Sequence, residues 1–138
     1  MTGNRRSVRV KWTGRSRVFE GTTQEAPVIT LDGDSGEGPS PTEALLMSLG
    51  ACIAIDVREI LEKGRVAVSD LEVEVDGDRA PEPPRRFTSI RVAVRVKGPV
   101  EADRPKLERA VQLSHDKYCS IFHTLRPDLN VRFSASLA

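Results

Sequence analysis

The two cysteines are the side chains of this 138-residue chain best suited to chemistry. Cys52 stands in SLGACIAIDV, two residues after a glycine, and Cys119 stands in DKYCSIFHTL. A thiolate is a strong nucleophile and a metal ligand, whereas a thiol buried in apolar surroundings is inert and serves only packing. On residue type alone, each cysteine is therefore either a packing residue or a working thiol.

The composition indicates a single globular domain over residues 1–138. Charged residues make up 30% of the chain, hydrophobic residues 38%, and the formal net charge is +1, which gives no general attraction to nucleic acid or an anionic membrane. The basic N-terminal residues include Arg9 and Lys11 on the wet face of a strand, with no interleaved stacking aromatics, so we expect no nucleic-acid partner.

The N-terminus lacks the apolar run of a signal peptide, and no apolar stretch reaches the roughly 18 residues of a membrane span. We therefore expect a cytoplasmic protein without a membrane partner. Structural thiols stay reduced in that compartment, so two cysteines do not indicate a disulfide framework.

Cys52 falls in a predicted helix over residues 41 to 63. Ser40-Pro41-Thr42-Glu43 has the pattern of a capping box with proline at the first helical position. Lys63 followed by Gly64 is typical of a helix end.

This helix is apolar on every side, since Ser48 is the one polar side chain between residues 44 and 55. A surface helix normally keeps a polar face, so we expect a second copy of the chain to cover it in a homodimer. Gly50 costs a helix about 1 kcal/mol relative to alanine and predicts the close approach of another backbone. A reactive Cys52 near such an interface needs a basic partner, which Arg15 or Arg17 can supply.

Alternating apolar and polar residues predict strands, and a 3.6-residue period predicts a second helix over 103–118 with a helical turn after Cys119. Alternation is seen at residues 8–12, 71–76, 90–97 and 131–136, and a short apolar run marks a further strand at 28–31. An alternating strand has one buried and one wet face, which favours antiparallel pairing and an inward-pointing Trp12. We predict an α+β fold, an antiparallel sheet with helices on one face.

Together, PSPTEALLMSLGACIAIDV and KYCSIFHTL resemble the OsmC-like family, which includes osmotically inducible protein C and organic hydroperoxide resistance proteins. The resemblance covers nearly the whole chain, and the segments VKW, AIDV and DKYCS are closest to a less characterised branch. It implies the OsmC-like fold, with a long central helix packed in an intertwined homodimer and thiol sites at the subunit interface.

The resemblance also implies a thiol peroxidase that favours organic hydroperoxides. In peroxidase members the first cysteine attacks the peroxide as a thiolate and becomes a sulfenic acid. The second condenses with it to a disulfide, which a dithiol then reduces. Carried over to this chain, Cys52 is the peroxidatic thiol and Cys119 the resolving thiol.

Two further catalytic residues follow from the resemblance. Arg15, with Arg17 as the second match, corresponds to the arginine that steadies the thiolate. Glu43 corresponds to the catalytic glutamate, although the position directly after the helix-starting proline is Thr42. Glu43 also has a purely structural explanation as the capping-box acid, and it precedes Cys52 by about 13 Å of straight helix.

Other functions remain open on the sequence. The same dimer could bind a small lipophilic or thiol ligand in its interface cleft without converting it. Thr42, which stands where peroxidase members have the catalytic glutamate, favours this alternative. His115 and His123 flank Cys119 and could form a zinc site with it and Cys52, but the spacing matches no compact zinc motif. We expect no metal and no cofactor.

Overall fold

The computed structural model describes residues 3–138, whose contacts divide into one compact unit up to Leu45 and another from Leu46. The boundary falls within helix α1 (Pro41–Lys63). That the whole chain forms one domain stays a prediction. No helix among the described residues is both long enough and apolar enough to cross a membrane.

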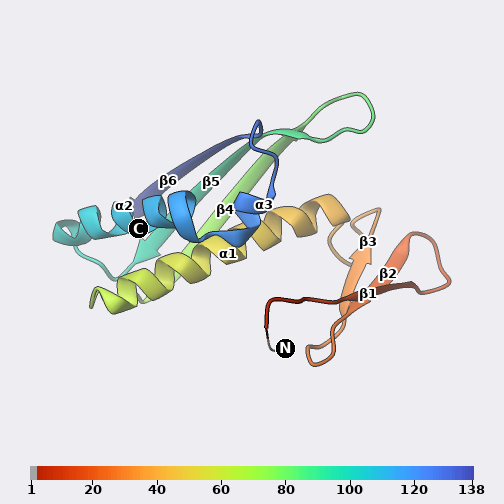
Figure 1. Ribbon diagram of the computed structural model, residues 1–138, viewed down its shortest axis with the longest axis horizontal. Helices are drawn as coiled ribbons and strands as arrows, with labels where there is room; N and C mark the ends of the chain where they lie inside the picture. The colour runs from red at the N-terminus through yellow and green to blue at the C-terminus, as the bar shows by residue number, and fades with distance from the viewer. Residues whose placement is uncertain (1–2) are drawn as a thin grey trace. The chain divides into compact units, whose positions relative to one another are not determined.

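The N-terminal unit is built on an antiparallel sheet of β1 (Arg9–Trp12), β2 (Val18–Thr22) and β3 (Ile29–Asp32), in that order (Figure 1). The sequence did not predict β2, because VFEGT shows no regular alternation. Trp12 is 55% exposed, so the inward orientation expected for it is wrong. Its indole nitrogen donates to the backbone oxygen of Ser16 at 3.0 Å, which holds the ring along the hairpin.

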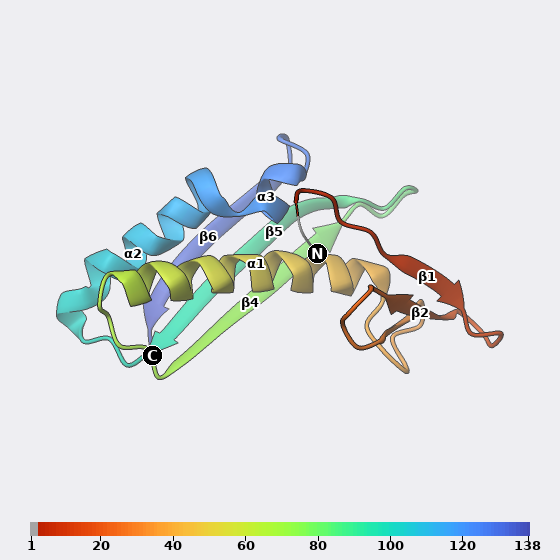
Figure 2. The same ribbon diagram turned by 60° about the horizontal axis from the view of Figure 1, so that its bottom comes forward.

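The C-terminal unit contains a second sheet, of β4 (Asp70–Arg79), β5 (Phe87–Lys97) and β6 (Asn130–Leu137). Its helical segments after β5 are η1 (Glu101–Asp103), α2 (Arg104–Leu113), the π-helical turn η2 (Ser114–Tyr118) and α3 (Ser120–Thr124). Figures 1 and 2 show α1 and α2 side by side on one face of this sheet.

The α+β class predicted from the sequence is confirmed, with one pairing that differs. β4 and β5 are antiparallel, but β6 runs parallel to β5. The connection from β5 to β6 passes through the helical segments, and a helical crossover of this kind returns the chain in the same direction. Alternation alone shows that a strand has one buried face, not which way its neighbour runs.

The core lies between the C-terminal sheet and its helices. The buried side chains of β5 meet one face of α1 and one face of α2, as the period-2 and helical patterns predict. They are Ile90, Val92, Val94 and Val96 from β5, Leu49, Ile53, Val57 and Leu61 from α1, and Leu107, Ala110 and Val111 from α2.

Helix α1 begins and ends where the sequence predicts. Ser40 Oγ accepts from the backbone nitrogen of Glu43 at 3.2 Å, and the Glu43 carboxylate accepts from the backbone nitrogen of Ser40 at 2.9 Å, so the capping box is confirmed. A Cβ on Gly50 would lie 3.0 Å from Val75 Cγ2. The close neighbour of Gly50 is thus a β4 side chain of the same chain, not another backbone.

Candidate thiol site

The two cysteines come together in the C-terminal unit. Cys52 lies in the middle of α1, and Cys119 lies between η2 and α3. Their sulfur atoms and a carboxylate oxygen of Asp56 all lie within 4.8 Å of one another. Both thiols are free.

Helix α1 supplies two of these three groups. Cys52 and Asp56 are four residues apart, which places them on one face of the helix. Cys52 is half-buried, and its sulfur lies 3.9 Å from Ser120 Oγ. The Asp56 carboxylate accepts a hydrogen bond from the hydroxyl of Ser114 at 2.9 Å.

Cys119, the third group of this site, follows a change from α-helix to π-helix. The regular α2 ends at Leu113, five residues before the predicted end, and the chain continues as a π-helical turn closed by the Cys119 backbone nitrogen donating to Ser114 oxygen at 2.9 Å. Single π-helical turns are frequent at functional sites. Cys119 is extended and begins α3, where its sulfur accepts from the backbone nitrogen of Phe122 at 3.3 Å.

The environment keeps Cys119 protonated. Its side chain is fully buried, and this burial raises the pKa of the Cys119 thiol to about 11, against the opposing effect of the Phe122 N–H. The neighbouring Cys52 and the negative charge of Asp56 raise this pKa further. Cys119 is therefore a neutral thiol at pH 7, and the half-buried Cys52 is the sulfur that a solute reaches first.

Asp56 is the residue of this site that the sequence analysis missed. Its spacing from Cys52 is the signal that was available, because residues at i and i+4 share a helix face. An acidic side chain in an otherwise apolar segment is unusual, and the AIDV segment was noted only for its likeness to one branch of a family.

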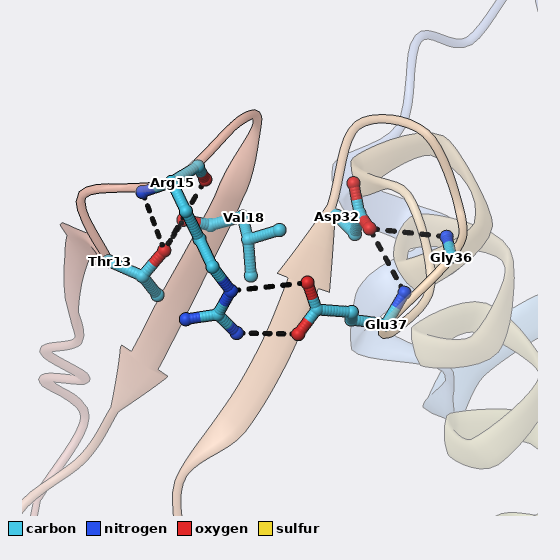
Figure 3. A network of polar contacts seen from close by, with 6 residues as sticks. All are labelled: Thr13, Arg15, Val18, Asp32, Gly36 and Glu37. Carbon is cyan, nitrogen blue, oxygen red and sulfur yellow. Dashed lines mark hydrogen bonds and ion pairs between the residues drawn. The ribbon is translucent and has the colours of Figure 1, made fainter.

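Arg15 lies in the N-terminal unit and has a carboxylate partner there (Figure 3). Its guanidinium makes a two-pronged contact with Glu37, with Nε donating to Oε2 at 3.2 Å and Nη2 donating to Oε1. The Arg15 guanidinium lowers the pKa of the Glu37 carboxyl. Glu37, which the sequence analysis did not single out, is thus the acid that binds the predicted arginine.

The loop after β3 fixes that acid. The buried Asp32 carboxylate accepts from the backbone nitrogens of Asp34, Gly36 and Glu37 at 2.8, 3.2 and 3.0 Å, and these hydrogen bonds lower the pKa of Asp32. Figure 3 shows the bonds from Gly36 and Glu37. Arg17 donates to the backbone oxygen of Gly33 in the same loop and pairs with Asp34 at 3.5 Å.

Glu43 also belongs to the N-terminal unit. Besides Ser40, its carboxylate accepts from the hydroxyl of Ser35, and these hydrogen bonds lower the pKa of Glu43, that of Ser35 most. The capping role is therefore observed. The structure brings Cys52 and Cys119 together, while Arg15 and Glu43 lie in the other unit, and their catalytic roles stay predictions.

The histidines do not join the thiols. His115 stacks near Phe122 and Phe133, with ring centroids 4.9 Å apart in each case, and its Nδ1 lies 2.7 Å from the Asp116 carboxylate. His123 Nε2 contacts the backbone oxygen of His115 at 2.9 Å. Within residues 3–138, the one group of three such side chains close enough to share a metal ion is Cys52, Asp56 and Cys119.

Known proteins place this arrangement in a family. Residues 33–134 match the family described as OsmC-like protein. This chain belongs to the OsmC-like family. The resemblance predicted from the two cysteine segments is therefore confirmed. A similar sequence is Protein YhfA of Escherichia coli K12, 42% identical over 127 residues, which cover 91% of this chain and 93% of the relative.

Solved structures share the fold of this chain. A hypothetical protein from Aquifex aeolicus superposes with a TM-score of 0.87 at 28% identity, covering 99% of this chain and 98% of that one. An organic hydroperoxide resistance protein OsmC from Legionella pneumophila superposes with a TM-score of 0.69 over 99% of both chains. At 14% identity, the second comparison shows a shared fold alone.

Proposed function

We propose that this OsmC-like protein is a thiol-dependent hydroperoxide reductase, with Cys52 as the peroxidatic thiol and Cys119 as the resolving thiol. The observation that carries the proposal is the meeting of the two sulfurs within 4.8 Å, from segments far apart in the sequence. Their unequal burial supports the division of roles, because a peroxide must reach the first thiol, whereas only the partner sulfur must reach the second.

The reaction balances with these two thiols and one external dithiol. The Cys52 thiolate attacks the outer peroxide oxygen. An S–O bond forms, the O–O bond breaks, and the alkoxide leaves and takes up a proton. The Cys119 sulfur then attacks the sulfenic sulfur, forming the S–S bond, while hydroxide leaves and takes the Cys119 proton as water. Dithiol exchange restores both thiols.

The thiolate needs a cation, and Arg15 is the candidate. Only the ionised sulfur is a good nucleophile, and Asp56 beside the site adds negative charge rather than positive. We propose that Arg15 reaches the thiolate as an Arg15–Glu37 pair, with Arg17 as the second candidate. Glu43 remains the proposed counterpart of the family's catalytic glutamate, although Glu37 is the acid that holds the arginine.

A homodimer is the proposed assembly. Large apolar side chains are exposed on the single chain in both units, where a second copy of the chain would cover them. On α1, Met47 is 60% and Ile55 58% exposed; in the N-terminal unit the set is Val8, Val10, Trp12, Val28 and Ile29. An Ile55→Glu variant is expected to sediment as a monomer where the unsubstituted chain sediments as a dimer. A dimer of unchanged stability in that variant would contradict this interface.

Organic hydroperoxides are the proposed substrates. The exposed apolar side chain of Ile55 stands three residues after Cys52 on α1, which favours an alkyl group over water near the sulfur. Proteins of the same fold are named organic hydroperoxide resistance proteins, in Legionella pneumophila and Bacillus subtilis.

Steady-state consumption of cumene hydroperoxide with dithiothreitol as reductant tests the function. The unsubstituted chain should consume it faster than hydrogen peroxide, and Cys52→Ser should reduce the rate to that of buffer. Cys119→Ser should complete the first reaction and then accumulate sulfenic acid, detectable with dimedone. A chain that consumes neither peroxide faster than buffer would overturn the proposal.

A second candidate function has one observation in its favour. The N-terminal unit contains an apolar hollow of about 340 Å³, which suits a small lipophilic ligand. Its lining residues are Val10, Arg17, Phe19, Leu31, Gly33 and Pro41. If binding is the function, a fatty acid should raise the melting temperature of Cys52→Ser as much as that of the unsubstituted chain. A lost shift in Phe19→Ala and a kept one in Cys52→Ser would locate the ligand here.

A further inference from the structure

We propose that Cys52, Asp56 and Cys119 form a binding site for a thiophilic divalent cation, with Zn²⁺ as the preferred ion. Two sulfurs and one carboxylate oxygen converge there from α1 and from the junction of η2 and α3. The inference goes beyond peroxide reduction and does not require it, because it concerns the donor groups alone. It also revises the expectation, drawn from the histidine spacing, that the chain holds no metal.

The distances fit a single small ion. Zinc binds thiolates at about 2.3 Å and carboxylate oxygens at about 2.0–2.2 Å, so two thiolates on one tetrahedral ion lie about 3.8 Å apart. The three donor atoms are within 4.8 Å of one another, so an inward shift of about 1 Å closes the set. Cys52 and Asp56 have the i, i+4 spacing by which a single helix presents two ligands to zinc in the HExxH motif.

The negative charge of Asp56 also favours a bound cation over a pair of thiols with no metal ion. The Asp56 carboxylate oxygen lies within 4.8 Å of both sulfur atoms. A divalent cation bound between the three atoms balances the charge of this carboxylate and displaces the thiol protons into solvent. Asp56 is therefore a disadvantage in a site for thiolates alone and an advantage in a metal site.

Hydrogen bonds from neighbouring residues orient two of the three donor groups. The fully buried Ser114 donates to the Asp56 carboxylate at 2.9 Å, and the Phe122 N–H donates to the Cys119 sulfur at 3.3 Å. Outer hydrogen bonds of this kind orient metal ligands. Three protein donors leave a fourth position beside the half-buried Cys52, where water or a solute can bind. Two sulfur donors select zinc, cobalt or cadmium over magnesium or calcium.

Cobalt titration of the reduced, chelator-treated full chain tests the site, since Co²⁺ reports thiolate ligands through near-ultraviolet charge-transfer absorption. We expect that absorption to saturate at one equivalent of Co²⁺ and to disappear when Zn²⁺ is added. Asp56→Asn should weaken Co²⁺ binding at least ~10-fold. Glu59→Gln, an exposed acid on the same helix, is the matched control and should bind as the unsubstituted chain does.

Cys119→Ser should lose about half of the charge-transfer intensity per bound cobalt, because one of two thiolates is gone. Circular dichroism of each variant shows that it is folded, and Asp56→Asn keeps both thiols in case Cys119→Ser fails to fold. Absence of charge-transfer absorption in the unsubstituted chain would overturn the inference. So would equal binding by Asp56→Asn and Glu59→Gln. Neither readout uses peroxide, so an inactive peroxidase leaves this result standing.

Discussion

The two units of the chain differ in how they bury apolar side chains. The C-terminal unit buries a continuous core and encloses its reactive groups, so that Cys119 is fully buried and Cys52 half-buried. In the N-terminal unit, Val18 and Asp32 are the buried residues among those described, while Val10 and Trp12 are exposed. Surface ion pairs form in both units, such as Arg15 with Glu37 in the N-terminal unit and Arg91 with Asp78 in the C-terminal unit.

The two units also differ in how much of the proposed site each one contains. The thiol pair is assembled from residues of the C-terminal unit alone. The N-terminal unit presents an apolar surface with little core of its own, which is the expected form of a segment that is stabilised by further contacts. The two thiols therefore meet within one unit, whereas Arg15, the basic partner proposed for the Cys52 thiolate, belongs to the other unit.

Stability should divide along the same line. Ile53→Ala removes a fully buried α1 side chain from the core, and such changes cost about 2–5 kcal/mol. Val10→Ala truncates an exposed side chain of β1 and should change the free energy of unfolding of the monomer by less than about 0.5 kcal/mol. Urea denaturation at high dilution measures both. Equal losses would mean that β1 is buried in the monomer.

The role proposed for Arg15 can be tested by substitution. Arg15→Gln keeps a polar side chain but removes the charge, and it should lower kcat/KM for cumene hydroperoxide about 100-fold, in the range found for lost electrostatic stabilisers. Arg17→Gln should lower it less than about 10-fold. A larger loss of kcat/KM in Arg17→Gln than in Arg15→Gln would assign the role to Arg17. Normal rates in both variants would show that neither arginine takes part in the reaction.

Helix α1 shows which features could be predicted from the sequence and which could not. Its capping box predicted the start and Lys63-Gly64 the end, because these are local hydrogen-bonding patterns. The thiol pairing could be predicted only through a family resemblance, since contact between distant segments depends on the tertiary fold. Asp56 could have been found from its spacing to Cys52 and was missed.

Other features lay beyond local patterns. The direction of β6 depends on the helical crossover before it, and the early end of α2 depends on a π-helical turn that leaves no periodic signal. Trp12 alternates as a buried residue does, yet it is exposed on the single chain. An alternating strand shows which face is apolar, not whether the chain itself covers that face.

The C-terminal unit should lose stability in alkali. Because the folded pKa of Cys119 is raised, from an ordinary 9.0 to about 11, its contribution is complete below pH 9 and is lost as pH rises toward 11. The loss is on the order of 2–3 kcal/mol in chelator-treated protein. Chemical denaturation at pH 8 and pH 10.5 measures it. Cys119→Ala should show a much smaller difference between the two, and an equal difference would contradict the assignment to this thiol.

The N-terminal unit should lose stability at acidic pH, by less than the C-terminal unit loses in alkali. The backbone hydrogen bonds to Asp32 lower its pKa, so their stabilisation is present above the unfolded value of about 3.9 and is lost as pH falls below it. The fluorescence of Trp12, the single tryptophan, reports this unit. Asp32→Asn should reduce the acid-induced change and leave the part due to Glu37 and Glu43, whose pKa values are also lowered. A change of the same size in that variant would exclude Asp32 as its source.

The most direct test of the thiol account is a stoichiometric oxidation. One equivalent of cumene hydroperoxide is added to fully reduced, chelator-treated protein, free thiols are counted, and bridged peptides are identified by mass spectrometry without reduction. The account predicts loss of both thiols and an intrachain Cys52–Cys119 disulfide within seconds, faster than with hydrogen peroxide. Two free thiols after minutes would contradict it and would leave this OsmC-like protein with the fold but without the reaction.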